Sequence, residues 1–462
     1  MKPLTLEGIA QAMHARIARG SGELEAAGVS TDTRTLAPGE LFFALVGKNF
    51  DGHEFVREAG GKGACAVVVE HPGVVQGPAG VRVVRSTVAA LGHLAQAVRG
   101  KLSADFVGVT GSCGKTTVKE MIAAVLGTSF KVVHAKKSYN NAIGVPLTIL
   151  SAPPDAGVVV LEMGTSAPGE IRALAEIARP DVGVVTNVGP THLEGLKSIE
   201  GVAAAKAELI EGLAEGGIAV LNWDDRWVRR MASWGQYRVV SYGRSKDADL
   251  RAVNVRLTEE GSAFTVGRTE FAIRVPGKHN VHNALAAIAV ALRFRLSIEK
   301  VAENLARFEL PPMRLERRSA GGVEILCDCY NANLLSVRGA IEELAAPRRR
   351  GGAARKVFVF GGMAELGERS AELHARVGRL AARRGIDVLV TVGSEADRAA
   401  QAAIQAGMRT SAVHRCEDMN AAGAALRGIV RRGDRVLFKA SRTAKLEELV
   451  EDLASRLAGC GV

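Results

Sequence analysis

The sequence predicts an α/β protein built from three domains. The chain has 462 residues, which is long for one domain when domains average roughly 150 residues. Short apolar runs alternate with helical stretches over most of its length, as in parallel sheets covered by helices. The pattern divides into three blocks, and we expect domains at residues 1–103, 104–312 and 313–462.

The first block predicts a small α/β domain. Its first 20 residues alternate apolar and polar side chains like an amphipathic helix, and they lack the continuous apolar stretch of a secretory signal. Helical stretches then mix with three strand-like runs: LFFALV from Leu41, ACAVVVE from Ala64 and VRVVR from Val81.

The other two blocks each predict a parallel sheet with helices on both faces. Strand-like runs in the second block are DFVGVT, VVVLEM, DVGVVTNV and GIAVLN, and residues 248–275 look like antiparallel β structure inserted among them. The third block has the runs VEILCDCYNA, KVFVFGG, DVLVTVG and DRVLFKAS, which predict a separate Rossmann-like unit.

Composition places the chain among ordinary globular proteins. It is 47% hydrophobic and 24% charged, and no apolar run approaches the ~20 residues that span a bilayer. Its six cysteines include no CxxC pair, so neither a disulfide framework nor a zinc ribbon is indicated. We expect a cytoplasmic protein with no membrane span.

The net charge of +11 is compatible with nucleic acid, a membrane surface or phosphate-bearing small molecules as partners. The arginines are scattered through alanine-rich helices, and aromatic residues make up only 4% of the chain. Stacking residues for nucleic acid are therefore missing. Solvated helix faces or phosphate-bearing substrates explain the charge better.

Residues 108–117 read GVTGSCGKTT and predict a phosphate-binding loop of unusual spacing. The common pattern G-x-x-x-x-G-K-[ST] would put its first glycine at position 109, where this chain has Val109. The context nevertheless fits, because a buried strand precedes the loop and the helical run TTVKEMIAAVL follows it. That order points backbone N–H groups and a helix dipole at phosphate.

Each residue type in the loop has a physical role. Gly111 and Gly114 allow the backbone to approach phosphate closely. Lys115 would neutralise the β- and γ-phosphates, and the hydroxyl of Thr116 would bind Mg²⁺. The alternative is an ordinary glycine turn followed by a surface lysine.

Two further side chains follow parallel strands. Glu162 lies near the end of the run VVVLEM, and His192 follows TNVGPT with Glu194 two residues later. Ligands of open α/β sheets bind at the carboxyl ends of strands, so these side chains are candidates for the same site as the loop. For His192 the alternative is a capping or packing role.

With these residues in this order, the chain resembles the Mur ligase family of ATP-dependent amide ligases. TGSCGKTT matches the family's glycine loop, and Glu162 in EMG, His192 in TNVGPTHLEG and Lys206 in AAAKAELI match in order and approximate spacing. The resemblance extends over essentially the whole chain. It implies a central P-loop domain flanked by an N-terminal UDP-binding domain and a C-terminal Rossmann-like domain.

Several stretches resemble the family members that add D-alanyl-D-alanine to UDP-N-acetylmuramoyl-tripeptide. The member that adds the third residue typically has Thr-Thr-Pro in place of Asn140-Asn141-Ala142 and Tyr-Ala-His in place of the run 330–333. The similar stretches are residues 31–55, 137–150, 277–291, 311–316, 327–333, 361–378 and 438–450.

The resemblance implies which residues bind the two nucleotides. The UDP end of the substrate is assigned to Thr31, Asp32, Thr33 and Arg34. ATP is assigned to Thr110, Gly111, Ser112, Cys113, Gly114, Lys115, Thr116, Thr117, Asn280, Asn283, Arg314 and Asp328. Of these, Cys113 stands at a variable position of the loop and is expected to be a small filler.

The resemblance also implies the catalytic set, which is Lys115, Glu162, His192 and Lys206. Lys206 matches a lysine that carries a carbamate derived from CO₂, an anion able to bind a cation. Two Mg²⁺ ions are implied, with Thr116, Glu162, His192 and carbamylated Lys206 as ligands. Without the resemblance, Lys206 would be read as a lysine on a helix surface.

For the incoming dipeptide, the resemblance implies contacts from the C-terminal domain. These are Tyr330, Asn331, Asn333, Lys439, Ser441 and Arg442, the last suited to a carboxylate by its planar fork. His374 is carried over only weakly. Leu334, Gly362 and Ala440 depart from the usual proline, aspartate and glycine, and we expect Leu334 to loosen the turn after Asn333 and Ala440 to restrict its loop.

The activity implied is carboxylate activation by ATP followed by attack of the dipeptide amine, in peptidoglycan precursor synthesis. We expect a monomer that acts on small molecules and not on nucleic acid. Three alternatives stay open: another ligase of the superfamily, adding the third residue or glutamates to folate; a basic P-loop ATPase acting on nucleic acid; and a degenerate binding scaffold.

Overall fold

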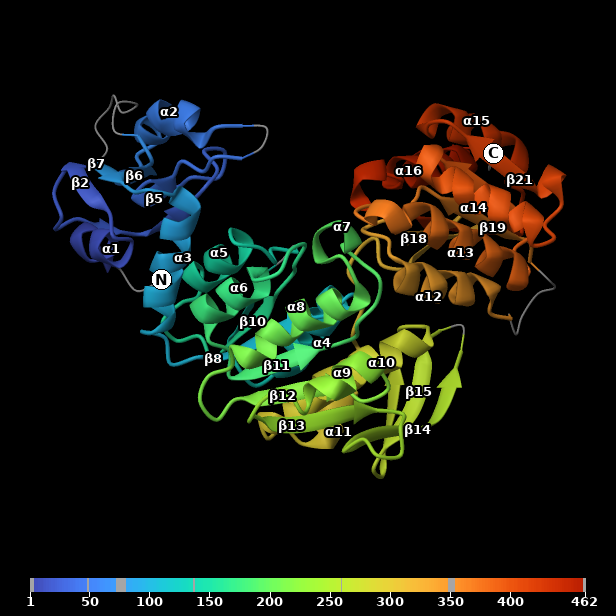
Figure 1. Ribbon diagram of the computed structural model, residues 1–462, viewed down its shortest axis with the longest axis horizontal. Helices are drawn as coiled ribbons and strands as arrows, with labels where there is room; N and C mark the ends of the chain where they lie inside the picture. The colour runs from blue at the N-terminus through green and yellow to red at the C-terminus, as the bar shows by residue number, and fades with distance from the viewer. Residues whose placement is uncertain are drawn as a thin grey trace.

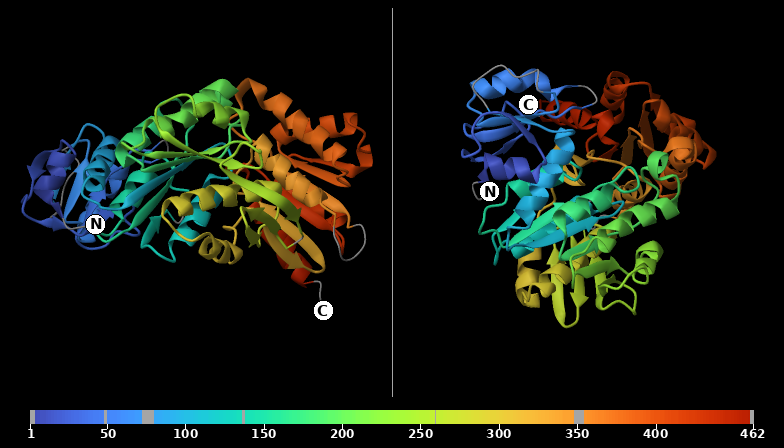
Figure 2. Two further views of the ribbon diagram at one scale, coloured as in Figure 1. Left: turned by 90° about the horizontal axis from the view of Figure 1, so that it is seen from below. Right: turned by 60° about the vertical axis from the view of Figure 1, so that its left-hand side comes forward.

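The computed structural model describes residues 4–47, 50–71, 80–135, 138–258, 260–347 and 354–459. Three large β-sheets form three bodies that follow one another along the chain, and β1 and β3 pair in a separate two-stranded sheet (Figure 1). The N-terminal body and the C-terminal body lie at opposite ends of the central one, as the view from below also shows (Figure 2). No helix among these residues is long and apolar enough to cross a membrane.

The N-terminal sheet has five strands in the order β2-β7-β6-β5-β4, of which only β2 runs antiparallel to its neighbour. The three predicted strands are present as β5, β6 and β7. The helix expected over the first 20 residues is only half correct: α1 ends at Ala12, and Arg16–Arg19 forms the exposed edge strand β2 on β7. The elements are β1 (Leu4–Thr5), α1 (Leu6–Ala12), β2 (Arg16–Arg19), β3 (Glu25–Ala26), β4 (Gly28–Ser30), β5 (Glu40–Phe43), α2 (Val56–Gly61), β6 (Ala66–Val69), β7 (Gly80–Val83) and α3 (Thr87–Arg99).

The central sheet has nine strands in the order β16-β15-β14-β13-β12-β11-β8-β10-β9. The expected antiparallel segment is present as β14–β16, and it extends this sheet because β14 pairs in parallel with β13. The strands are β8 (Asp105–Thr110), β9 (Val132–His134), β10 (Val158–Glu162), β11 (Val182–Val185), β12 (Ile218–Asn222), β13 (Arg238–Gly243), β14 (Leu250–Leu257), β15 (Ser262–Val266) and β16 (Thr269–Ile273).

Both faces of the central sheet are buried, which explains why its strands are continuous apolar runs. Val107 and Val109 of β8 share a hydrophobic cluster with α4 and α10, whereas Phe106 shares another with α5 and α6. The helices are α4 (Lys115–Leu126), α5 (Gly144–Leu150), α6 (Glu170–Ala178), α7 (Leu193–Leu196), α8 (Ile199–Glu211), α9 (Arg226–Met231), α10 (Lys278–Arg293) and α11 (Ile298–Ala306).

The C-terminal sheet has six strands in the order β17-β18-β22-β19-β20-β21, and all but the edge strand β17 are parallel. The four predicted runs form β18, β19, β20 and β22, while β17 and β21 were not predicted. The elements are β17 (Glu316–Ala320), β18 (Val323–Asp328), α12 (Leu334–Ala345), β19 (Lys356–Phe360), α13 (Ser370–Arg383), β20 (Val388–Val392), α14 (Ser394–Gln405), β21 (Val413–Cys416), α15 (Met419–Ile429), β22 (Arg435–Lys439) and α16 (Glu447–Gly459).

Candidate active site

The phosphate loop joins β8 to α4 at the carboxyl edge of the central sheet, and its two glycines are sterically required. Gly111 has φ +146°, and a Cβ there would lie 1.9 Å from Thr186 Oγ1. Gly114 is the N-cap of α4 at φ +85°, and a Cβ there would lie 2.6 Å from Asn283 Oδ1. The close approach expected of these glycines is therefore built into the loop, although Val109 fills the place of the usual first glycine.

Hydrogen bonds from the next strand fix the shape of the loop. The hydroxyl of Thr186 donates to the carbonyl of Cys113, and the backbone N–H of Cys113 donates to Asn187 Oδ1 at 2.9 Å. The hydroxyl of Thr110 donates to the carbonyl of Met163 at 2.8 Å. Thr186 and Asn187, which sequence reasoning missed, are thus residues that fix the conformation of the loop.

The first residues of α4 meet the strand-end glutamate, as expected. The Thr116 hydroxyl donates to Glu162 Oε2 at 2.7 Å, and Asn140 Nδ2 donates to Glu162 Oε1 at 2.8 Å. Lys115 Nζ donates to the carbonyl of Gly111 at 2.9 Å. A hydroxyl and a carboxylate side by side beside an ammonium group form a donor set suited to Mg²⁺ and phosphate together.

Residues of the C-terminal domain reach this loop directly. Arg314 Nη2 donates to Thr116 Oγ1 at 2.8 Å, and its guanidinium lies 4.4 Å from the centre of the Tyr330 ring. Asn333 Nδ2 donates to the carbonyl of Ser112 at 2.9 Å. The phosphate loop is therefore covered by the C-terminal domain.

The two domains enclose a cavity of about 1060 Å³. Among the predicted site residues, those that line it are Ser112, Cys113, Gly114, Lys115, Thr116, Thr117, Glu162, Asn280, Asn283, Arg314, Asp328, Tyr330, Asn331, Asn333 and Lys439. Of the residues predicted for ATP, Thr110 and Gly111 are not in the lining, and the predicted catalytic residues His192 and Lys206 are not in it either. The cavity thus brings together most of the residues predicted for ATP and four of the six predicted for the dipeptide.

The buried amides Asn280 and Asn283 lie one turn apart at the start of α10. Asn280 Nδ2 donates to the carbonyl of Pro276 at 2.7 Å, and Asn283 Nδ2 donates to Asn280 Oδ1 at 2.9 Å. Because both side chains also line the cavity, they form a polar wall beside the phosphate loop.

Lys206 lies on α8 with only 1% of its surface exposed, so it is not the surface lysine of the alternative interpretation. Among the described residues, no hydrogen-bond or ion-pair partner is recorded for its amine. Burial, together with the nearby charge of Lys115, holds the pKa of Lys206 well below its ordinary value. Burial also lowers the pKa of Lys115, where the Glu162 carboxylate opposes the effect.

His192 precedes α7 and is three-quarters buried, with Nδ1 bonded to the carboxylate of Glu365 from the C-terminal domain. Burial lowers the pKa of His192, the Glu365 carboxylate opposes this effect, and the charges of Lys115 and Lys206 add to it. Glu365 was not predicted, since nothing in its local sequence indicates a partner 173 positions away. Among the described residues, no group of three or more His, Cys, Asp or Glu side chains is arranged to hold a metal ion.

The remaining residues predicted for the dipeptide are already paired. Lys439 Nζ lies 2.7 Å from Asp328 Oδ2 and donates to the carbonyl of Asn331 at 2.6 Å. Arg442 pairs with Glu447, and the Ser441 hydroxyl lies 3.2 Å from that of Thr443. Ser441 and Arg442 lie outside the cavity lining.

The three departures in the C-terminal domain have local explanations. Leu334 does not loosen the turn: it is the first residue of α12, and Asn333 and Ser336 form a capping box that fixes the helix start. Ala440 is fully buried and is not among the described residues with positive φ, so the expected restriction has no effect there. Gly362 has φ +85°.

His374, carried over weakly, has a structural role. Its side chain is fully buried, its Nε2 accepts the backbone N–H of Met363 at 3.0 Å, and its Nδ1 lies 2.8 Å from the carbonyl of Ser370. Burial lowers the pKa of His374. The ring therefore holds the loop after β19 as a neutral imidazole.

The four residues predicted for the UDP end lie far along the chain from the cavity, on the loop between β4 and β5. The Arg34 side chain donates to both carboxylate oxygens of Asp32, with Nη2 2.6 Å from Oδ2, and this hydrogen bonding lowers the pKa of Asp32 to about 2. The Arg34 side chain is 85% exposed. Lys62 Nζ donates to the carbonyl of Thr33 at 2.8 Å, and Thr31 stands next to β4.

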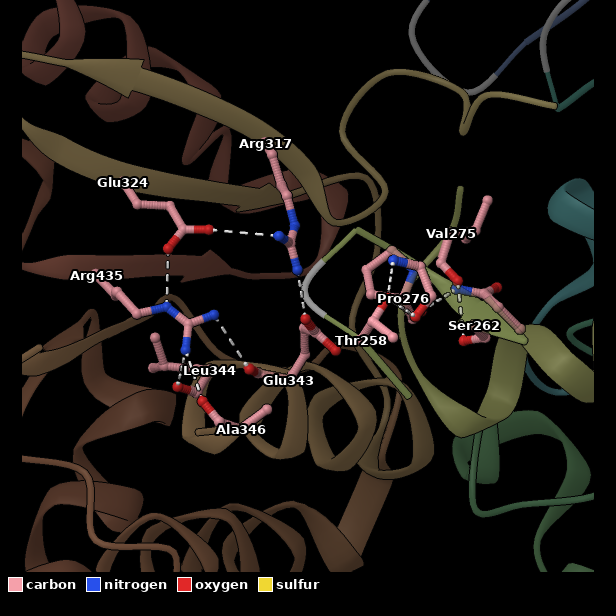
Figure 3. A network of polar contacts seen from close by, with 12 residues as sticks. Thr258, Ser262, Val275, Pro276, Arg317, Glu324, Glu343, Leu344, Ala346 and Arg435 are labelled. Atoms are coloured by element: carbon pink, nitrogen blue, oxygen red, sulfur yellow. Dashed lines mark hydrogen bonds and ion pairs between the residues drawn. The ribbon is translucent and has the colours of Figure 1, made fainter. Parts of the chain in front are cut away.

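The outer wall of the cavity is an ion-pair network that the sequence did not indicate (Figure 3). Arg317 Nη2 lies 2.6 Å from Glu343 Oε1, and Arg435 Nε lies 2.8 Å from Glu324 Oε2. Arg435 Nη1 also donates to the carbonyls of Leu344 and Ala346 at the end of α12. A cation at a helix carboxyl end is favourable, so this network anchors α12 beside the cavity.

Comparison with known protein families shows to which class of proteins this chain belongs. Residues 25–99 match the Mur ligase family catalytic domain, residues 109–291 match the Mur ligase middle domain, and residues 313–442 match the Mur ligase glutamate ligase domain. The chain belongs to the Mur ligase family.

Its relatives include the UDP-N-acetylmuramoyl-tripeptide–D-alanyl-D-alanine ligase of Bacillus subtilis, 39% identical over 431 residues that cover 92% of this chain and 93% of the relative. The enzyme of the same name from Escherichia coli is 36% identical and covers 94% of this chain and 96% of the relative.

Solved structures agree with this grouping. MurF from Acinetobacter baumannii superimposes with a TM-score of 0.89 at 27% identity, covering 98% of this chain and 99% of that one. The MurF ligase of Thermotoga maritima in complex with ADP has a TM-score of 0.82 at 29% identity, covering 94% and 98%. The predicted three-domain α/β fold is confirmed.

Proposed function

We propose that this chain uses ATP to join D-alanyl-D-alanine to UDP-N-acetylmuramoyl-tripeptide in peptidoglycan precursor synthesis. Its relatives at 36–39% identity carry that activity in their names, and they align with nearly the whole chain. The observation that carries the proposal is the closure of the C-terminal domain on the phosphate loop through Arg314 and Asn333. Such closure excludes water from a site that forms a reactive intermediate.

In this proposal each of the three domains, with boundaries near residues 103 and 312, binds a different substrate. The N-terminal domain binds the UDP end through residues 31–34, where the Arg34 guanidinium is exposed to solvent and is paired with Asp32. The central domain binds ATP, and an ADP complex of a 29% identical relative supports nucleotide use. The C-terminal domain supplies the dipeptide side of the cavity.

The reaction begins with phosphoryl transfer from ATP to the terminal carboxylate of the tripeptide. Two anions must approach each other, and at ~4 Å with an effective dielectric constant of ~20 two unit charges repel by about 4 kcal/mol, a factor of about a thousand in rate. The Lys115 ammonium and the backbone N–H groups at the start of α4 would face the phosphates in this proposal and would oppose this repulsion.

Mg²⁺ fits the same place. Thr116 Oγ1 and Glu162 Oε2, 2.7 Å apart, would hold one ion, with Asn140 fixing the carboxylate through its other oxygen. When bound, Mg²⁺ would neutralise charge on the transferring phosphoryl group. His192 would serve a second ion, as the family resemblance implies.

Lys206 is chemically suited to carbamylation. Its side chain is buried, its amine has no recorded partner among the described residues, and its pKa is lowered, which favours the neutral amine that attacks CO₂ over the ammonium form. The nitrogen forms a bond to the carbon of CO₂ and loses a proton, which leaves an anion. That anion would relieve the repulsion between Lys206 and Lys115.

In the second step the dipeptide amine attacks the acyl phosphate, and phosphate leaves. Tyr330, Asn331 and Lys439 line the cavity and are candidates to orient the dipeptide. Asn333 is used differently from the expectation, because its amide caps α12 and holds Ser112. Arg442 would have to leave Glu447 to bind a carboxylate.

The test is a ligation assay with the purified chain, ATP, Mg²⁺ and D-alanyl-D-alanine. UDP-N-acetylmuramoyl-tripeptide is supplied in two forms, ending in diaminopimelate or in lysine, and both product mass and released phosphate are measured. We expect one adduct and one phosphate per turnover, and Lys115→Ala should reduce turnover by about a thousandfold. Lys246→Ala, an exposed lysine on the same domain, is the matched control. The absence of an ATP-dependent adduct would refute the proposal.

A further inference from the structure

The contact between His192 and Glu365 joins two domains in an unusual way. The His192 ring and the Glu365 carboxylate are directly hydrogen-bonded, and each residue has a left-handed backbone, at φ 52° and 60°. Few residues other than glycine adopt that conformation, because it costs free energy. Both sides of the contact are therefore held in place by their surroundings.

The surroundings on both sides are also in contact. The backbone N–H of Glu194 donates to the carbonyl of Glu365 at 3.3 Å. Gly367 approaches so closely that a Cβ there would lie 3.3 Å from the Cα of Glu194. Leu193 and Leu366 are buried in one hydrophobic cluster. This is a fitted junction between α7 and the loop after β19, and not a chance pairing of two surface side chains.

His192 connects this junction with the residues predicted to be catalytic. It follows β11, it caps α7, and α8 with Lys206 comes directly afterwards. The charges of Lys115 and Lys206 both act on its ring. The segment that meets the C-terminal domain therefore leads directly to the buried Lys206, and its His192 lies within electrostatic range of Lys115.

We propose that Glu365 is a positioning residue that orients His192 only when the C-terminal domain is closed. This inference rests on the proposed function and deepens it. With Nδ1–H donating to the Glu365 carboxylate, Nε2 carries the lone pair and the ring cannot rotate freely. When the domain opens, the carboxylate leaves and the ring loses its fixed orientation. The reaction centre is thus complete only in the closed enzyme, which prevents transfer of the phosphoryl group to water.

The chain offers a matched control. Glu368 lies three residues further along in the same loop, is exposed, and has no recorded ion pair or hydrogen bond within the described part of the chain. The variants are Glu365→Ala, Glu365→Gln and Glu368→Ala. The amide of Glu365→Gln retains an oxygen that can accept the His192 N–H, so it should rescue part of the effect.

Turnover is measured with saturating substrates, together with KM for ATP and for the dipeptide and the Mg²⁺ dependence of turnover. We expect Glu365→Ala to lower kcat by about 10- to 100-fold, the usual effect of removing a residue that orients a ligand, with KM for the dipeptide unchanged. It should also raise the Mg²⁺ concentration needed for half-maximal rate. Glu368→Ala should match the unsubstituted enzyme.

A second readout needs no turnover. Small-angle X-ray scattering compares the radius of gyration with and without a non-hydrolysable ATP analogue and Mg²⁺, and we expect compaction in the unsubstituted chain and less of it in Glu365→Ala. Turnover of Glu365→Ala equal to that of Glu368→Ala would overturn the proposal, as would a fall in thermal stability with normal kcat. If the unsubstituted chain compacts but forms no adduct, the proposed function fails and the scattering comparison still tests Glu365.

Discussion

The two outer domains attach to the central domain by different kinds of contact. On the N-terminal side, α3 packs against α5 and α6, and buried residues such as Leu94, Ile149 and Leu174 belong to one hydrophobic cluster that continues across the boundary. On the C-terminal side a hydrophobic cluster is also shared, but the hydrogen bonds fall on the phosphate loop and on His192.

The difference suits the N-terminal contacts to holding their domain in place and the C-terminal contacts to opening and closing the site. Both attachments bury apolar side chains, which stabilises them, and the C-terminal one differs in adding hydrogen bonds that end on the phosphate loop and on His192. Hydrogen bonds exchange with water at small net cost, so the C-terminal contacts can form and break during turnover. We therefore expect substitutions on the two sides to affect different measurements.

The largest effect is expected on the N-terminal side. Leu94→Ala removes a fully buried side chain from the shared cluster and should destabilise the chain by about 2–5 kcal/mol, with kcat at low temperature nearly unchanged. Thermal or urea unfolding measures it. Gln96→Ala, an exposed position on the same helix, should cost less than about 1.5 kcal/mol. A stable Leu94→Ala variant with impaired turnover would contradict the distinction between the two interfaces.

On the C-terminal side, Arg314→Ala should show the opposite behaviour. It removes the hydrogen bond to Thr116 and the contact with Tyr330, and hydrogen bonds to charged groups contribute about 1.5–3 kcal/mol. We expect kcat/KM for ATP to fall by roughly 10- to 100-fold with little change in unfolding temperature. Arg307→Ala, an exposed arginine just before the C-terminal domain, is the control. An equal loss of activity in both variants would argue against a specific contact.

The smallest effect concerns pH and His374, which supports the loop that carries Glu365. Because burial lowers the pKa of His374 in the folded protein, the unfolded chain binds its proton first as pH falls below about 6.5. Stability should therefore decrease between pH 7 and pH 5, and His374→Gln should reduce that pH dependence. Thermal unfolding across this range measures it, with His414→Gln in the same domain as the control. A pH dependence that is unchanged in His374→Gln would show that other groups are responsible.

The sequence predicted those parts of the site that depend on local patterns of strand, turn and helix. The phosphate loop, Thr116 and the strand-end Glu162 follow from a strand, a glycine turn and a helix in order, and the structure brings them together. Glu365 could not be found in this way, because its partner lies in another domain. The role of Asn333 could have been predicted in part, since Asn followed three residues later by Ser336 suits a helix N-terminus.

The two loop glycines have a consequence for resistance to inhibitors. A side chain at Gly111 or Gly114 would collide with Thr186 or Asn283, so neither position can change without disturbing the loop itself. An inhibitor that gains its affinity from the backbone N–H groups of this turn would bind atoms that mutation cannot remove. We expect resistant strains to carry substitutions elsewhere in the cavity, where side chains rather than backbone form the contacts.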